Sequence, residues 1–515
     1  MGARNIADRE SRNLFDLPAQ KVRNSNTPLS YTIYIYESIE KVLALEQRIL
    51  GVLALIRSAR NLTVAVNRLP PEVLAKILGF RHDDRDLISA THVCGWWRSI
   101  LLSTPLLWTE VVFGGPDRTL TYLERSKLAP LRVSIWGSAI HSSTGDMSWI
   151  GRMNSLCISG DKEQIESTAG QLCLPAPLLQ SLAFSRPPGL QDWTTVGHSI
   201  HIPPAFLAQR VPSLRNLAFL SISPSPVTGI PLQNLTNLRW TNSMVVIGEL
   251  LTLLESAPLL EVIILEFGSG PASVKPRKFI TLSKLRKLIW VIRGRFSLMR
   301  FIIAPELNDL SIRLNYSHIL HNNNPSIILP PHQEHVPLLT EPTALRYVCH
   351  DFTRTWNFTY PSGRLTISES PEFRTLDPPV DRWLAPSTPI SFRSTKRLVV
   401  EGFNGFPLPG NIPIEQFESL EYLKLVGEVD RLLKILQPNG NMTNGTLPVP
   451  FLSHLELRPT LFRSNFPFVA LVEILRQRKV AGHGVKSVRI AGEYGKCPSG
   501  LVSRLTKLVD VLTLD

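Results

Sequence analysis

The chain has 515 residues, a net charge of +13 and 43% hydrophobic residues. This length exceeds that of a usual single domain, so we expect several folded units or one long repeat array. The cysteines, which are odd in number and include no CxxC pair, argue against a disulfide framework or a zinc site. No apolar signal region starts the chain and no 18-residue apolar run lacks a charge, so we expect no membrane span and a location in the cytoplasm and/or nucleus.

The positive charge is spread along the chain. Lysines and arginines occur mostly as single residues, with small clusters at 275–278 and 476–479. A basic surface attracts polyanions, but no known nucleic-acid-binding motif accompanies the charge. We therefore expect no nucleic acid and consider an acidic partner protein at least as plausible.

Residues 1–30 are polar and contain two prolines, which predicts a mobile tail. Residues 31–62 predict an amphipathic helix with apolar positions at heptad spacing: Ile35, Val42, Leu45, Ile49, Val52 and Ile56. This seam is compatible with a dimeric coiled coil. About three heptads is short for that purpose, so the preferred interpretation is a helix packed within a monomer.

Residues 68–108 predict three short helices. Pro70 and Pro71 suit a first helical turn, and Glu72 suits the positive end of the helix dipole. Acidic capping candidates at 83, 84 and 86 precede a second helix, and a third, starting at Trp96, ends before Pro105. About 40 residues with so many apolar side chains form a small unit, which needs a partner surface.

The segment resembles the F-box, a trihelical module. The resemblance depends on the LPPEVL phrase at 69–74, on Ile77-Leu78, on Val93-Cys94 with Trp97-Arg98, and on Pro105 with Leu107-Trp108. It places an F-box at 66–112 and implies docking to a Skp-type adaptor and, through it, to a cullin scaffold of a ubiquitin ligase. The residues that it assigns to this contact, or to the core beneath it, are Leu69, Pro70, Ile77, Leu78, Val93, Trp97 and Trp108. Trp96, beside Trp97, departs from the common pattern.

Residues 113–515 repeat a leucine phrase of the form LxxLxL. Its anchors are Leu182, Leu217, Leu238, Val262, Leu288, Leu310, Leu345, Leu365, Leu398, Leu423, Leu455 and Val488, mostly about 20 to 35 residues apart. This period is typical of leucine-rich repeats, in which each unit adds one strand to a parallel sheet. Helices are expected at 247–255, 429–436 and 468–479, whereas residues 314–396 fit the period poorly.

The expected fold is thus an α/β solenoid: an N-terminal helix and a trihelical F-box, followed by an irregular leucine-rich-repeat horseshoe. Phrases at 122–131 and 175–184 extend the resemblance to fungal F-box proteins with divergent leucine-rich repeats. In an LxxLxL strand the residue between the last two anchors faces outward. Arg239, Ser311, Lys424 and Glu456, with Arg313 and Arg458 two positions on, are therefore candidate contacts for a substrate protein.

The sequence offers little catalytic chemistry. His332 and His335 lie among prolines, Gly268 to Pro271 lacks the lysine of a phosphate loop and is read as a turn, and Cys94 fits a buried apolar position. We expect no enzyme, cofactor or metal. The preferred function is a substrate-recognition adaptor of a Skp–cullin–F-box ubiquitin ligase. A non-ligase repeat scaffold and a basic solenoid that binds nucleic acid are the alternatives.

Overall fold

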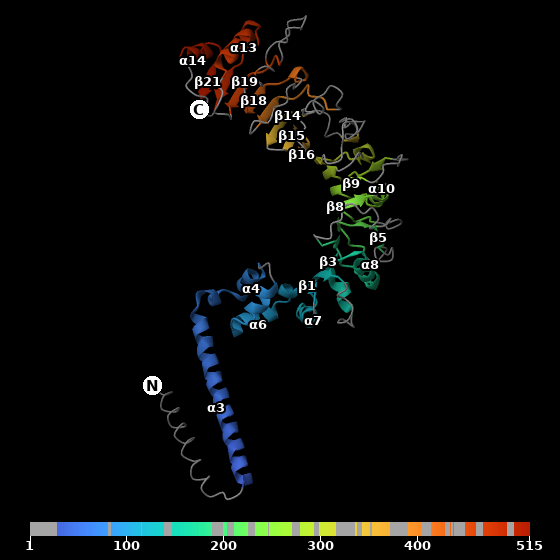
Figure 1. Cartoon of the computed structure of the whole chain (residues 1–515), viewed down its shortest axis with the longest axis vertical. Coiled ribbons are helices and arrows are strands. Elements are labelled where there is room, and N and C mark those ends of the chain that lie inside the picture. Colours follow the sequence, from blue (N-terminus) through green and yellow to red (C-terminus); the bar gives the residue numbers. More distant parts are fainter. Residues whose placement is uncertain are drawn as a thin grey trace. The chain divides into compact units, whose positions relative to one another are not determined.

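The computed structural model describes residues 28–80, 84–114, 116–137, 147–172, 174–187, 199–202, 211–224, 232–245, 247–269, 279–292, 298–315, 335–336, 342–350, 353–370, 390–402, 414–427, 433, 436, 449–459, 467–491 and 499–515. It divides into two compact units (Figure 1). Unit 1 comprises Met1–Trp108 and Arg125–Lys127, and unit 2 comprises Thr109–Glu124 and Leu128–Asp515. The expected tail lies outside the described residues except for its last three, which are helical.

Unit 1 is helical. A long helix comes first, followed by a 3-10 turn and the three short helices that the sequence predicts. Their bounds are α3 (Pro28–Thr63), η1 (Ala65–Arg68), α4 (Pro71–Gly79), α5 (Asp84–Ala90), α6 (Gly95–Ser103) and η2 (Pro105–Trp108). Pro71 occupies the first turn of α4, where a proline costs no hydrogen bond.

Helix α3 exposes many of its apolar side chains. The exposed fractions of these side chains lie between 36% and 71%. They include every residue of the heptad seam from Ile35 to Ile56. Within unit 1 the described residues leave the seam exposed, and packing of this helix against another part of the monomer stays a prediction.

Unit 2 is built on a large, mostly parallel sheet. Among the described residues, seventeen strands belong to it. They are β1 (Glu110–Phe113), β2 (Leu131–Trp136), β3 (Met153–Ser159), β4 (Ser181–Ser185), β6 (Asn216–Leu220), β8 (Asn237–Val245), β9 (Val262–Ser269), β11 (Lys287–Ile292), β13 (Asp309–Asn315), β14 (Ala344–His350), β15 (Thr353–Tyr360), β16 (Gly363–Ser370), β17 (Arg397–Gly402), β18 (Tyr422–Gly427), β19 (His454–Pro459), β20 (Ser487–Ile490) and β21 (Val511–Leu514).

Strand pairing follows chain order except between β13 and β17, where β14, β15 and β16 stand in reverse order. From β1 to β13, and again from β17 to β21, each strand of the sheet pairs in parallel with the next along the chain. Between them β13 pairs with β16, and β14 with β17. Strands β14, β15 and β16 form an antiparallel meander. Antiparallel neighbours need no crossover connection. Residues 314–396 therefore lack the repeat period of the other strands, although the sheet continues through them.

The predicted anchors form one row across this sheet. Leu182 pairs with Leu217, Leu217 with Leu238, and the row continues at matching positions to Val488. Phe358 of β15 fills the place between Leu365 and Leu345. At β9 the prediction is wrong by one residue: Ile263, not Val262, pairs with Leu238 and is fully buried.

Helices accompany only some of the strands. They are α7 (Pro116–Arg125), α8 (Lys162–Gln171), α10 (Ile247–Ser256), α13 (Phe468–Val480) and α14 (Ser499–Thr506). Helices α10 and α13 confirm the expectations for 247–255 and 468–479, whereas the helix expected at 429–436 lies almost wholly outside the described residues. Helices α8 and α10 lie on the same side of the strands (Figure 1). The opposite face carries the alternate, outward side chains and is called here the open face.

A second row of buried side chains lies beside the row of anchors. Two positions after them stand aromatic side chains such as Phe184, Phe219 and Trp240, all essentially inaccessible to solvent. Phe219 lies between the other two, with ring centroids 5.8 Å from Phe184 and 5.3 Å from Trp240. Large aromatic rings contribute strongly to such a core, which therefore fixes the register of the sheet.

Candidate interaction surfaces

The three short helices of unit 1 enclose a small core. Its buried side chains come from all three helices and from η2: Leu74, Leu78, Leu87, Ile100, Leu101 and Trp108. Trp108 donates its indole N–H to the Leu101 carbonyl at 2.8 Å, and the Arg125 guanidinium stacks over its ring at 4.4 Å. The core is thus complete without the remaining apolar residues.

Several of the remaining apolar residues are exposed to solvent. In 66–114, large apolar side chains that are more than one third exposed are Val66, Val73, Ile77, Phe80, Ile88, Val93, Trp96 and Leu106. Single exposed apolar residues are ordinary, but so many on a segment this short mark an interaction site. We call Ile77, Phe80, Val93 and Trp96 the apolar surface of unit 1.

The sequence-predicted docking residues divide between core and surface. Pro70, Ile77 and Val93 are exposed, Leu69 and Trp97 are half-buried, and Leu78 and Trp108 belong to the core. The exposed group is available to a partner. The buried group can act only by holding the helices that carry it.

Asn67 is a residue that sequence reasoning missed. Its Oδ1 accepts a hydrogen bond from Trp97 Nε1 at 2.6 Å, and its Nδ2 donates to the Asn61 carbonyl at 2.7 Å. One side chain thereby joins the end of α3, the η1 turn and α6. Cys94 is also half-buried and caps α6 by accepting from Trp97 N–H, which corrects its reading as a purely apolar core residue.

The six predicted substrate contacts lie on the open face of unit 2. Arg239, Ser311, Lys424 and Glu456 occupy one register row, between the two buried rows. Arg313 and Arg458 stand two positions on. Arg239, Arg313 and Arg458 are exposed, and the other three are half-buried. The pleat therefore presents all six as the alternation predicts.

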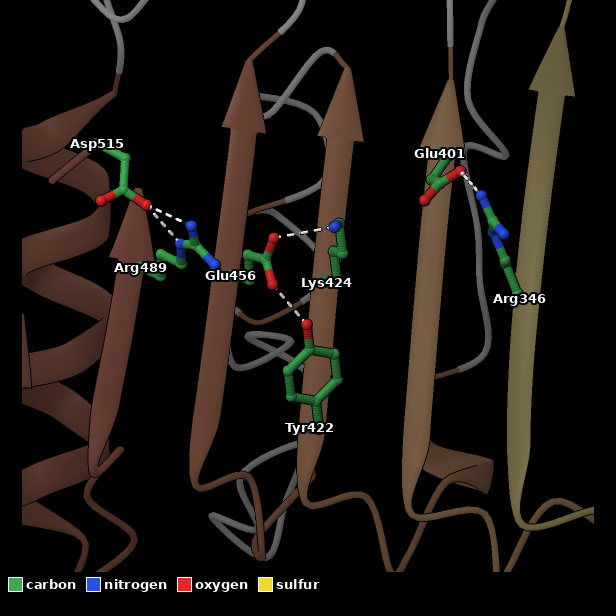
Figure 2. Close-up of polar contacts among 7 residues, drawn as sticks. All are labelled: Arg346, Glu401, Tyr422, Lys424, Glu456, Arg489 and Asp515. Carbon is green, nitrogen blue, oxygen red and sulfur yellow. Dashed lines mark hydrogen bonds and ion pairs between the residues drawn. The ribbon is translucent and has the colours of Figure 1, made fainter. Parts of the chain in front are cut away.

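Charged side chains alternate in sign across the last strands of the open face (Figure 2). Arg346 pairs with Glu401 at 2.7 Å, Lys424 with Glu456 at 2.9 Å, and Arg489 with Asp515 at 2.5 Å. Each pair joins adjacent strands or their ends. We call these six residues the ion-pair ladder. Its charges cancel, so it stabilises strand order more than it attracts a charged partner.

Glu456 is held by two different side chains of the neighbouring strand. The Tyr422 hydroxyl donates to it at 2.5 Å, in addition to the Lys424 ammonium. Burial raises the pKa of Glu456, but the hydrogen bonds from Tyr422 and Lys424 outweigh it and leave the pKa below its usual range. Burial and the same hydrogen bond raise the pKa of Tyr422 to about 12.

Three of the predicted substrate contacts are arginines outside the ladder. Arg239, Arg313 and Arg458 are exposed and have no ion-pair partner among the described residues. They add three positive charges to this face, on which the strand register also places Glu266 of β9. An acidic segment of a partner protein fits that charge.

The described residues contain neither a cluster of metal-binding side chains nor a membrane-spanning helix. No group of three or more metal-binding side chains occurs among those residues, and no helix there is long and apolar enough to cross a membrane. His332 lies outside the described residues, so the H-x-x-H phrase has no described geometry. Gly268, expected in a turn, pairs in register at the end of β9.

Comparison with known proteins matches one segment of the chain to a family. Residues 66–114 match the F-box-like family, which covers the three short helices, η2 and β1. No curated protein matches the chain. An F-box-like domain indicates a role in protein–protein interaction, F-box domains bind Skp-type adaptors, and F-box proteins are generally non-catalytic adaptors.

Proposed function

We propose that the protein is a substrate-recognition adaptor of a Skp–cullin–F-box type ubiquitin ligase. The F-box-like domain docks to the Skp-type adaptor, and the open face of unit 2 holds a substrate protein. The observation that carries the proposal is the apolar surface of unit 1, which lies within the matched segment and is not buried by the described residues. Such machinery acts in the cytoplasm and/or nucleus.

The docking contact depends on apolar burial. Ile77, Val93 and Trp96 present large side chains to solvent. Burying such surface contributes about 25 cal/mol per Å², and a few central anchors usually dominate an interface. The ring of Trp96, absent from the common pattern, enlarges that surface.

The substrate half of the proposal is supported by strand order. Parallel strands paired along the chain, with leucine anchors in one row, are the arrangement of a leucine-rich-repeat array. In such an array the alternate residues form a long binding face. No covalent chemistry is required there, because holding a substrate near a conjugating enzyme raises the local concentration of its lysines.

Binding of a purified Skp-type adaptor to the full chain tests the docking half. The double variant Ile77→Asp/Val93→Asp places charges on the apolar surface, and we expect adaptor affinity to fall on the order of a hundredfold. Both positions are exposed, so the fold should persist, which circular dichroism checks.

Val469→Asp is the matched control. Val469 is an apolar residue of α13, even more exposed than Ile77 or Val93 and outside the F-box-like segment. This variant should bind the adaptor like the unmodified chain. Equal binding by the double variant and the unmodified chain would refute the docking proposal.

A further inference from the structure

Helix α3 carries an apolar seam that the F-box-like domain does not use. Its a positions are Ile35, Val42, Ile49 and Ile56, and its d positions include Leu45 and Val52. These six side chains are between 36% and 59% exposed. From Ile35 to Ile56 the seam extends about 30 Å at 1.5 Å per residue, which is three heptads.

The remaining positions of the helix match a paired arrangement. Opposite the seam, at positions c and f, stand small or polar residues: Glu37, Glu40, Ala44, Gln47, Gly51, Ala54, Ser58 and Asn61. The back of the helix is thus small or polar, while Leu43, Leu50 and Leu53 beside the seam widen its apolar stripe. The seam repeats every 3.5 residues, which is the period of a left-handed coiled coil.

Residue types at the seam are compatible with a second copy as the partner. β-Branched residues fill all four a positions, and the d positions carry Ser38, Leu45, Val52 and Ala59; β-branched a residues with leucine at d favour two parallel strands. In a parallel pair each g residue faces the following e residue of the partner. Lys41 at g and Glu46 at e have opposite charges, are exposed, and have no ion-pair partner among the described residues.

We propose that α3 mediates a parallel homodimer of this chain through the seam from Ile35 to Ile56. Each helix then buries the other's a and d residues, and Lys41 of each copy pairs with Glu46 of the other. Because Asn67 joins the end of α3 to α6, the dimer brings two F-box-like domains into one particle. The proposal does not depend on adaptor binding.

The occupant could instead be the chain's own first 27 residues. Their large aliphatic and aromatic residues are Ile6, Leu14, Phe15, Leu17 and Val22, and Pro18 interrupts them. Their spacing does not follow the 3-and-4 alternation of a heptad, so they do not match the seam. A second copy does match it.

Sedimentation equilibrium of the full chain over a concentration series tests the dimer. We expect the unmodified chain to dimerise, and Val42→Asp/Ile49→Asp to raise the dissociation constant on the order of a hundredfold. Leu43→Asp/Leu50→Asp is the matched control: it replaces equally exposed apolar residues one position off the seam, and most dimer should remain.

Orientation is tested by a charge exchange. Lys41→Glu should weaken the dimer, and adding Glu46→Lys should restore it, because only a parallel pair sets these two positions against each other. The proposal is overturned by a monomer at every concentration, by a dimer that survives the seam variant, or by a chain that dimerises only after residues 1–27 are removed. Failure of the exchange to restore the dimer overturns the parallel orientation.

Discussion

Trp97 donates its indole N–H to Asn67 Oδ1 at 2.6 Å, the shortest link between the F-box-like helices and the turn that precedes them. Asn67 uses its amide nitrogen at the same time to hold the Asn61 carbonyl at the end of α3. Both ends of the amide are therefore satisfied, which fixes its orientation. The consequence is that α6 is anchored to α3 through one side chain.

Asn67→Ala should loosen this junction. It removes the hydrogen bonds of Asn67 to Trp97 Nε1 and to the Asn61 carbonyl, which keeps the Val64 N–H, and the net loss is about 1 kcal/mol of unfolding free energy per hydrogen bond. We expect a lower thermal midpoint of unit 1, measured by circular dichroism, and faster hydrogen exchange in η1. Trp97→Phe should have little additional effect in the Asn67→Ala background.

Asn61→Ala is the matched control for that variant. Asn61 contributes its backbone carbonyl to the junction, which alanine retains. The same thermal shift in Asn61→Ala and Asn67→Ala would show that the helix end, and not the amide bridge, determines the stability.

Gly363→Ala should disrupt the inverted part of the sheet. An added Cβ would lie 1.9 Å from the Asn308 carbonyl oxygen, which already accepts the Arg364 N–H at 2.8 Å. Backbone must move, and we expect a loss of about 3 kcal/mol in unfolding free energy. Hydrogen exchange should show reduced protection in β13 and β16.

Gly248→Ala provides the comparison. Gly248 lies in α10, and a Cβ there meets nothing within 4 Å. Alanine favours helix, so stability should rise by up to about 1 kcal/mol. Unchanged stability in Gly363→Ala would contradict the close approach of β16 to the segment before β13.

Glu456→Gln should weaken the ladder in a pH-dependent way. The folded chain lowers the pKa of Glu456, so its carboxylate stabilises the fold above the ordinary pKa and loses this effect as the pH falls through the folded value. In urea unfolding we expect a loss of about 1 kcal/mol near neutral pH. The difference from the unmodified chain should shrink as the pH falls through the lowered pKa of Glu456.

Glu418→Gln tests whether an exposed ion pair of this sheet behaves like the pair made by Glu456. Glu418 contacts Arg393 at 3.4 Å, but both side chains are well exposed. Such pairs contribute little, so this variant should resemble the unmodified chain at neutral and at acid pH. A Glu456→Gln difference that persists at acid pH would show that the carboxylate charge is not its cause.

Sequence periodicity was sufficient for the anchor row but not for its exact register. Leu217, Leu238 and Leu288 lie where the LxxLxL phrase places them. At β9 the run LLEVII is apolar at nearly every position, so alternation could not separate Val262 from Ile263. The anchor therefore differed by one residue.

The sequence pattern could not predict contacts between residues that are distant in the chain. The meander of β14 to β16 pairs strands against chain order, and local phrases contain no record of that pairing. Asn67 was missed for the same reason, since its partner Trp97 is thirty residues away. The three short helices were predictable because their caps, prolines and apolar stripes are all local signals.

The arginines outside the ladder should determine substrate binding without affecting the fold. Arg239→Glu/Arg313→Glu/Arg458→Glu reverses three exposed charges that have no ion-pair partner among the described residues, so the thermal midpoint should change little. Proteins cross-linked to the full chain, quantified by mass spectrometry, should lose acidic partners on the order of tenfold. Arg393→Glu/Arg476→Glu, exposed but already paired with Glu418 and Glu473, is the charge control. If the control and the triple variant lose the same partners, the net charge of the chain, and not the open face, selects them. A separate titration uses generic DNA: binding to the unmodified chain with a steep salt dependence would favour a nucleic-acid ligand instead.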